Sequence, residues 1–359
     1  MNPLREASQF GQSLWLDNLS RTLLKEGTLK RLIEEDGISG LTSNPSIFHK
    51  AVSDSPYYRD ELAALKASTP DAEARYEALA IPDIQAACDL LRPVYDKTNG
   101  DDGYVSLEVS PKLAANEVGT VQAALRLKQA VARDNLLIKV PATSQGLRAI
   151  EHLIGQGVSV NVTLMFSLHH EMEVAQAYIR GLKKWVASGG DARKVKSVAS
   201  IFLSRVDTLV DKKLEQKGTP EALALRGKTA VAMAKLAYQR YKDLFHSHAF
   251  AELAANGARP QYPLWASTGT KNSAYSDVMY VEPLIGPQTV NTLPDTTIAM
   301  FRDPGKSAAT LEQNVEEAKQ HYLALERIGI DMNVIGEQLQ EEGVKLFDEA
   351  YSKLLQLVA

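Results

Sequence analysis

Short apolar or alternating runs, each followed by an amphipathic stretch, repeat along the whole chain. A run of four to eight such residues bounded by turn residues predicts a strand, whereas apolar residues three and four apart predict a helix. Eight runs fit the strand pattern, at residues 13–19, 37–45, 104–111, 136–140, 158–164, 195–202, 262–268 and 288–293. Residues 278–285 compete with the last of them. Eight alternations of strand and helix predict an α/β fold of the (β/α)₈ barrel type, the TIM barrel.

The chain is longer than a typical barrel of this type, and the additional residues are predicted to form two helical regions. A barrel of this type takes about 250 residues, and the chain has 359. A helical insertion at about 49–100 and a helical extension at about 304–359 account for the difference. No Pro/Gly/Ser-rich linker divides the chain, so we expect one domain over 1–359. The alternative is an open doubly wound sheet, but that fold requires a glycine-rich first turn, which LWLDNLSRT lacks.

The run LLIKV at residues 136–140 is apolar except for Lys139. Such a run is typical of a parallel strand that is buried on both faces. Burying an unpaired ammonium group is costly, and loss of its proton relieves that cost. The neutral amine that remains is a nucleophile toward carbonyl groups. The alternative is a lysine that pairs with a carboxylate or reaches water at the strand end.

Polar side chains gather at the carboxyl ends of the predicted strands, where barrels of this type have their active sites. They are Asp17, Asn44, Glu108, Lys139, Asn161, Thr163, Ser200 and Ser267. Two carboxylates, one lysine and several neutral hydrogen-bonding groups suit Schiff-base chemistry on a carbonyl substrate.

Each of these residues also has a simpler explanation. Asp17 or Asn44 can cap the helix that follows its strand. Glu108 can serve only to neutralise Lys139. The polar residues of 158–164 can be hydrogen-bonded core residues. Only their convergence at one end of one barrel favours catalysis.

A cation after each of two strands indicates a phosphate site. Arg205 falls in the first turn of the helix after the sixth strand. A cation there opposes the helix dipole, whereas a bound anion is favoured. Lys271 follows the STGT loop after the seventh strand, a region where barrels often bind phosphate. The alternative is that Asp207 compensates the charge of Arg205.

Composition excludes several classes of function. The net charge is −4, from 40 basic and 44 acidic residues, and no basic stretch with interleaved aromatics indicates a nucleic-acid partner. No apolar run approaches the roughly 18 residues of a membrane helix, and the first residues lack a signal-peptide pattern. With a single cysteine, Cys88, these features predict a soluble cytoplasmic protein. The histidine pairs at 169–170 and 246–248 lack the spacing of a helical metal site, so no metal is expected.

Six motifs occur in a characteristic order along the chain: GLTSNPSIF, YVSLEVSP, LLIKVPAT, VNVTLMFS, ASIFLSRVD and WASTGTKN. Together they resemble the transaldolases, the sugar-phosphate enzymes of the pentose phosphate pathway. The resemblance runs from about Gln12 to the C-terminal helix, which is nearly the whole chain. The long spacing and the STGTKN loop are similar to those of a longer bacterial subgroup.

The resemblance implies a role for each matching residue. Lys139 matches the Schiff-base lysine, and Asp17 matches the acid/base group for the C4 hydroxyl of the substrate. Glu108 and Thr163 match the pair that positions a catalytic water. The implied substrate-binding residues are Asn44, Asn161, Ser200, Phe202, Arg205 and Ser267. Lys271 departs from the pattern, because other transaldolases have an arginine within a shorter loop shortly after the serine that matches Ser267; we expect Lys271 to bind phosphate instead.

The implied activity transfers a dihydroxyacetone unit from sedoheptulose 7-phosphate to glyceraldehyde 3-phosphate, giving erythrose 4-phosphate and fructose 6-phosphate. The expected partners are sugar phosphates. No cofactor is expected, because the imine itself is the electron sink. The oligomeric state could be a monomer or a homodimer. One rival is a fructose 6-phosphate aldolase that releases free dihydroxyacetone, and another is a barrel that binds sugar phosphates without turnover. Phe202 favours transfer, because the resemblance suggests that aldolase relatives have a tyrosine there, whose hydroxyl can hold a water.

Overall fold

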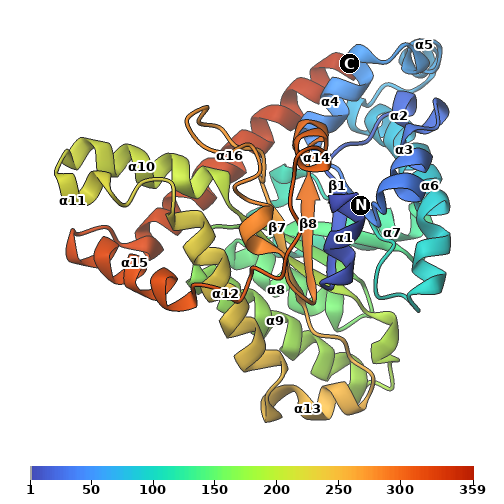
Figure 1. The fold of residues 1–359 in the computed structure, drawn as a ribbon. Coiled ribbons are helices and arrows are strands. Elements are labelled where there is room, and N and C mark those ends of the chain that lie inside the picture. The colour runs from blue at the N-terminus through green and yellow to red at the C-terminus, as the bar shows by residue number, and fades with distance from the viewer. Residues whose placement is uncertain (1) are drawn as a thin grey trace.

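Eight parallel strands close into a barrel in the order β1-β2-β3-β4-β5-β6-β7-β8, in a computed structural model that describes residues 2–359. The helices lie around this barrel (Figure 1). The strands are β1 (Gln12–Leu16), β2 (Gly40–Thr42), β3 (Val105–Glu108), β4 (Leu136–Pro141), β5 (Val160–Met165), β6 (Ser197–Phe202), β7 (Tyr262–Ala266) and β8 (Thr289–Leu293). The predicted (β/α)₈ barrel is confirmed.

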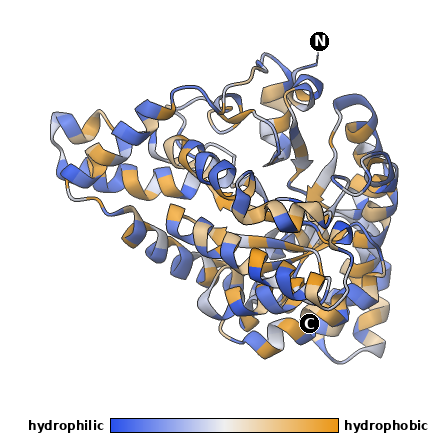
Figure 2. Cartoon of the chain, turned by 90° about the horizontal axis from the view of Figure 1, so that it is seen from below, coloured by the Kyte–Doolittle hydropathy of each residue, from blue (hydrophilic) through white to orange (hydrophobic). Residues whose placement is uncertain are grey.

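Helices precede, connect and follow the strands. In chain order they are α1 (Pro3–Gln9), α2 (Arg21–Lys25), α3 (Thr28–Arg31), η1 (Leu32–Asp36), α4 (Pro45–Asp54), η2 (Pro56–Tyr58), α5 (Arg59–Ser68), α6 (Ala72–Lys97), η3 (Pro111–Leu113), α7 (Glu117–Val131), α8 (Ser144–Ile154), α9 (Leu168–Ala187), η4 (Ala192–Lys194), α10 (Ser204–Lys217), α11 (Pro220–Leu223), α12 (Thr229–Phe245), α13 (His248–Ala255), η5 (Glu282–Leu284), α14 (Asp295–Arg302), α15 (Val315–Arg327) and α16 (Met332–Val358). Orange and blue residues alternate along them in Figure 2, as in amphipathic helices.

The two additional helical regions form as expected. Helices α4, α5 and α6 lie between β2 and β3, where an insertion at 49–100 was predicted, and α15 and α16 form the tail. In Figure 1 the red α16 crosses the molecule and ends at the C-terminus beside α4. The assignment of the chain to a single domain stays a prediction.

Several strands are shorter than the runs that predicted them, because the last residues of those runs cap or begin the following helix. The run at 37–45 gives only Gly40–Thr42, since the side chain of Asn44 accepts the Ile47 amide at 3.0 Å and starts α4. The run at 104–111 ends at Glu108, and Pro111 begins the short helix η3. The eighth strand is the preferred run at 288–293.

The fifth strand departs from simple alternation at its carboxyl end. The pairing of β5 with β6 shifts register between Val162 and Met165. Leu164, inside this irregularity, has a φ of +60°. A leucine in the left-handed region is strained, so its surroundings must hold it there.

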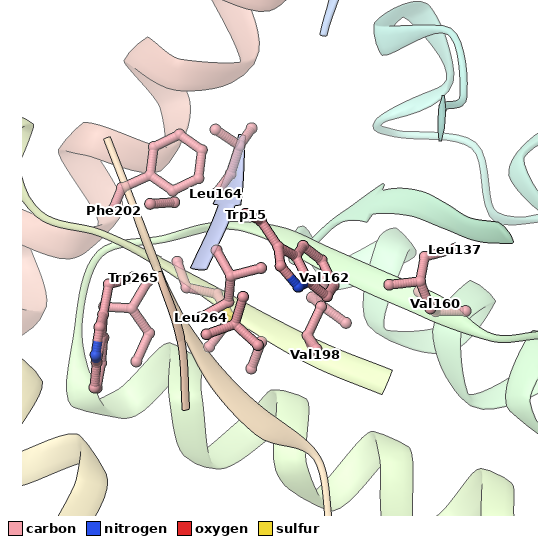
Figure 3. Close-up of a cluster of buried hydrophobic side chains, with 14 of the residues drawn as sticks. Trp15, Leu137, Val160, Val162, Leu164, Val198, Phe202, Leu264 and Trp265 are labelled. Atoms are coloured by element: carbon pink, nitrogen blue, oxygen red, sulfur yellow. The ribbon is translucent and has the colours of Figure 1, made fainter. Parts of the chain in front are cut away.

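Large side chains fill the middle of the barrel. Trp15 pairs in register with Gly40, and a Cβ on Gly40 would lie 2.4 Å from the indole nitrogen of Trp15. The indole therefore requires a glycine opposite it, and its N–H donates to Asp102 at 2.9 Å. Figure 3 shows Trp15 in a cluster of buried hydrophobic side chains that also includes Leu164 and Phe202. This apolar layer separates the polar groups at the amino ends of the strands, such as Ser13 and Asp102, from those at the carboxyl ends.

Candidate active site

Strand register brings the central residues of the predicted site to one level. Lys139 on β4 is the Cα partner of Glu108 on β3 and of Asn161 on β5. In parallel strands, partners of this kind point to the same face. A lysine, a carboxyl group and an amide therefore lie side by side on the inner face.

The ammonium group of Lys139 is buried and has two polar neighbours. The residue is 6% exposed. Its Nζ donates to the Ser43 carbonyl at 2.8 Å and lies 3.6 Å from Glu108 Oε2. Lys139 therefore pairs with a carboxylate, as the simpler of the two explanations predicted. Burial raises the pKa of the Glu108 carboxyl, and the charge of Lys139 opposes this rise. A carboxyl group with a raised pKa can both give and take protons nearer neutrality.

Asp17 lies just beyond β1 and is held by the strands on either side. Its backbone N–H donates to the Leu293 carbonyl at 2.8 Å, and Thr42 Oγ1 donates to its Oδ1 at 2.8 Å. Thr42 also shares a 2.6 Å hydrogen bond with Thr292. Burial raises the pKa of Asp17, and the Thr42 hydroxyl and the charge of Lys139 partly oppose it. Helix capping, the simpler role, is done instead by Ser20, which accepts the Leu23 amide at 3.1 Å.

The amide of Asn161 is fixed from both sides. Its Nδ2 donates to Ser106 Oγ at 3.1 Å, and its Oδ1 accepts from Ser200 Oγ at 2.6 Å. Within residues 2–359, two buried oxygens near Asn161 have no hydrogen-bond partner: Thr163 Oγ1, and Glu108 Oε2, whose polar neighbour is the Lys139 Nζ at 3.6 Å. Buried polar atoms are rarely left unpaired without a reason. These two retain hydrogen-bonding capacity for a substrate hydroxyl or a catalytic water.

Arg205 is the second residue of α10, and its side chain is only partly satisfied. In the described part of the chain, its buried Nη1 has no hydrogen-bond partner, and burial lowers the pKa of its guanidinium. Asp207 accepts instead from the Ala230 amide and the Tyr280 hydroxyl, both at 2.8 Å. Burial raises the pKa of Asp207 to about 6. Compensation by Asp207 is therefore not what the structure shows.

Ser267 and Lys271 lie differently in the loop after β7. Ser267 has a φ of +54°, and its hydroxyl shares a 2.7 Å hydrogen bond with Ser204, the residue before Arg205. Lys271 is exposed, four residues further on, and its charge slightly opposes the rise in the pKa of Asp17 that burial causes. Ser267 thus lies against the start of α10, whereas Lys271 lies at the rim.

The remaining predicted residues have structural contacts as well. Asn44 caps α4 with its side-chain oxygen. Phe202 is 8% exposed, and its ring lies 5.2 Å from that of Phe166 and 6.4 Å from that of Phe347. The guanidinium of Arg205 lies 5.8 Å from the centre of the Phe202 ring. Phe202 therefore links an aromatic cluster to the guanidinium.

Several contributors to this site were not singled out by sequence reasoning. They are Thr42, Ser43, Ser106, Ser204 and Thr292. Two of them could have been found from strand alternation, because residues two apart on a strand point to the same face. Ser106 lies two residues before Glu108, and Thr42 lies two before Asn44. The carbonyl of Ser43 carries no such signal, since any residue could supply it.

The described residues lack two kinds of feature, a cluster of metal ligands and a membrane-spanning helix. Among residues 2–359, no group of three His, Cys, Asp or Glu side chains is arranged to hold a metal ion. In the same residues, every helix is too short or too polar to cross a membrane.

Comparison with known proteins identifies the family. The family model "Transaldolase/Fructose-6-phosphate aldolase" matches residues 14–358. A transaldolase of Thiobacillus denitrificans is 56% identical over 355 residues, covering 99% of each chain. A transaldolase of Neisseria gonorrhoeae is 45% identical with 99% of each chain covered, and one of Frankia alni is 44% identical with 100% of this chain and 97% of the relative covered. The chain belongs to the transaldolase/fructose-6-phosphate aldolase family.

Proposed function

We propose that this protein is a transaldolase that transfers a dihydroxyacetone unit between sugar phosphates through an imine on Lys139. Three relatives at 44–56% identity are named transaldolase. One observation supports the mechanism most directly: Lys139 is buried at the carboxyl end of β4, 3.6 Å from Glu108, and its charge opposes the rise in the pKa of Asp17 that burial causes. These are the groups that imine formation and carbon–carbon cleavage require.

The first half-reaction begins with loss of a proton from Lys139, for which Glu108 is the nearest carboxylate. The Nζ atom then attacks the C2 carbonyl of the ketose phosphate, and a carbinolamine forms. Loss of its hydroxyl as water leaves the protonated imine. Thr163 Oγ1 and Glu108 Oε2, which lack hydrogen-bond partners among residues 2–359, can orient the water involved in this step.

Cleavage and transfer then follow from the position of Asp17. Asp17 takes the proton of the C4 hydroxyl, the C3–C4 bond breaks, and its electron pair passes into the imine to give an enamine. The aldose phosphate leaves. A second aldose phosphate is attacked at its aldehyde carbon by C3 of the enamine, Asp17 returns the proton to the new hydroxyl, and hydrolysis releases the product ketose.

The activity is tested by mixing fructose 6-phosphate with erythrose 4-phosphate. A transaldolase should form sedoheptulose 7-phosphate and glyceraldehyde 3-phosphate in equal amounts, with neither product from one substrate alone. Chromatography with mass detection measures all four sugars. Release of free dihydroxyacetone from fructose 6-phosphate alone, at a rate comparable to transfer, would make the protein an aldolase instead.

Phe202 is expected to decide between transfer and release. Release requires protonation of the enamine and attack of water on the imine, and phenylalanine neither orients water nor leaves room for it. Phe202→Tyr adds one hydroxyl at little change in volume. We expect this variant to raise the ratio of dihydroxyacetone release to transfer by about tenfold or more, since a positioned proton-transfer group is worth about 10²–10⁴-fold. Enzymatic determination of dihydroxyacetone measures the release.

Phe166 provides the matched control, because its ring packs against Phe202 and it is not among the proposed substrate-binding residues. Phe166→Tyr should leave the ratio unchanged. An unchanged ratio in Phe202→Tyr as well would mean that Phe202 serves only to pack the aromatic cluster.

Arg205 is proposed to hold the substrate phosphate. Its unpaired buried Nη1 and its position at the start of α10 favour an anion there. Arg205→Ala should weaken kcat/KM for sugar phosphates by about 10- to 150-fold, corresponding to about 1.5–3 kcal/mol for lost charge-assisted hydrogen bonds. Imine formation with unphosphorylated dihydroxyacetone should persist. Lys271→Ala should show the same pattern more weakly, as an exposed cation contributes less.

Lys212, an exposed cation on the same helix, is the control for the change in net charge. Lys212→Ala should behave as wild type. If Arg205→Ala and Lys271→Ala keep the wild-type preference for phosphorylated over unphosphorylated sugars, the phosphate binds elsewhere.

A cytoplasmic location and a single domain over 1–359 belong to this proposal. Sugar phosphates are intracellular substrates, and the single cysteine, Cys88, is buried and unpaired, as is common in reducing compartments.

A further inference from the structure

The carboxyl ends of β4 and β5 are joined by a residue from the far end of the sequence. The side-chain amide of Gln340, on α16, donates to the carbonyl of Ala142 at 3.0 Å and to the carbonyl of Leu164 at 3.1 Å. Ala142 follows β4 directly, three residues after Lys139, and Leu164 follows Thr163 on β5. Both protons of one neutral amide are therefore used to connect the two strands.

Glycines on α16 let it approach the strand ends closely enough for this contact. Gly336 and Gly343 lie four residues before and three residues after Gln340, on the same helical face. A Cβ on Gly336 would lie 2.7 Å from the Cβ of Ser167, and one on Gly343 would lie 2.9 Å from a methyl group of Leu164. Four residues further along this face, Phe347 packs on Phe202. The face is thus shaped to fit the mouth of the barrel.

The carbonyl that Gln340 binds on β5 belongs to the strained residue of that strand. Leu164 has a φ of +60° beside the register shift in β5, a conformation that persists only when its surroundings impose it. The residue before it is Thr163, whose hydroxyl has no partner in residues 2–359. The direction of the Thr163 side chain therefore depends on what holds Leu164.

We propose that Gln340 is a positioning residue for imine formation: by bridging Ala142 and Leu164 it fixes the end of β5 relative to β4, and so fixes Thr163 relative to Lys139. This inference rests on the proposed Schiff-base function. A leucine at 340 offers no donor, and an asparagine is one methylene too short to reach both carbonyls. The geometry thus requires glutamine for a reason separate from packing.

The test is a comparison of Gln340→Leu with wild type in two measurements. Single-turnover imine formation is followed by borohydride quenching with fructose 6-phosphate, and steady-state transfer gives kcat and KM. We expect both the rate of imine formation and kcat to fall by about 10- to 100-fold, because misplacement of a reacting group by about 1 Å costs rates of this order. The KM for fructose 6-phosphate should change by less than about threefold.

Gln338→Leu is the matched control, because Gln338 lies on the same helix and donates its amide to the exposed Glu342 at 2.8 Å. It should retain wild-type rates. Gln340→Asn retains a polar amide at the site, so it carries the test if Gln340→Leu does not fold, and we expect an intermediate rate.

A lower melting temperature with an unchanged rate of imine formation would mean that Gln340 only stabilises the fold, and it would overturn the inference. A rise in KM alone would overturn it too. Absence of an imine in the wild-type enzyme would instead overturn the proposed function, so the two failures are distinguishable.

Discussion

Replacing Lys139 by arginine is expected to abolish both transfer and imine formation. A guanidinium does not lose a proton in proteins and so cannot attack a carbonyl, whereas it keeps the positive charge beside Glu108. Treatment of the wild-type enzyme with borohydride and fructose 6-phosphate should add a three-carbon unit to the peptide that contains Lys139. The Lys139→Arg variant should gain no such mass, and its kcat/KM should fall below detection. Mass spectrometry of the digested protein measures the adduct.

Two other buried lysines serve as controls inside the same experiment. Burial lowers the pKa of Lys196 and lowers that of Lys235 to about 8, so proton loss alone would make either a candidate. However, Lys196 pairs with Asp101 at 2.8 Å and Lys235 donates to the carbonyl of Thr310 at 2.7 Å, both outside the proposed site. Neither peptide should gain mass. An adduct on one of them, or none on Lys139, would refute the assignment.

Asp17→Asn is expected to separate imine formation from cleavage. Asparagine retains the oxygen that accepts the Thr42 hydrogen bond, but it cannot take the C4 hydroxyl proton. Loss of a general base costs about 10²–10⁴-fold in rate, so transfer should fall by that factor while the imine still forms. Borohydride should then trap the uncleaved six-carbon sugar phosphate on Lys139, where the wild type yields the three-carbon adduct.

Asp295 provides the matched control for this change in charge. It is exposed, accepts a hydrogen bond from Asn18 at 2.7 Å, and its charge makes a small contribution to the raised pKa of Asp17. Asp295→Asn should keep the three-carbon adduct and near wild-type transfer. A three-carbon adduct formed at the normal rate by Asp17→Asn would show that another group takes the proton.

The amino-acid sequence alone determined the barrel and the residues that face its interior. Periodicity is a local property, and strand–helix alternation repeated eight times leaves few other folds. The alternation at 158–164 already assigned Asn161 and Thr163 to one face of β5. Because parallel strands end at the same edge, residues that follow successive strands could be grouped as one candidate site before any contact was known.

The tertiary structure decided which groups touch. Arg205 and Asp207 are close in sequence, yet Asp207 bonds to Ala230 and Tyr280 instead. The boundaries of the strands also depended on contacts. From the sequence, Asn44 could end a strand or cap a helix, and its hydrogen bond with the Ile47 amide makes it the cap of α4.

The contacts of α16 were beyond any local pattern. Gln340 binds carbonyls that lie 198 and 176 residues earlier in the chain, and a backbone carbonyl has the same chemistry whatever residue carries it. The left-handed backbone conformation of Leu164 could not be predicted from the sequence either, because leucine has no preference for that conformation. Hydrophobic periodicity determines which face of an element is buried, whereas only the packed chain determines which distant backbone atoms that face meets.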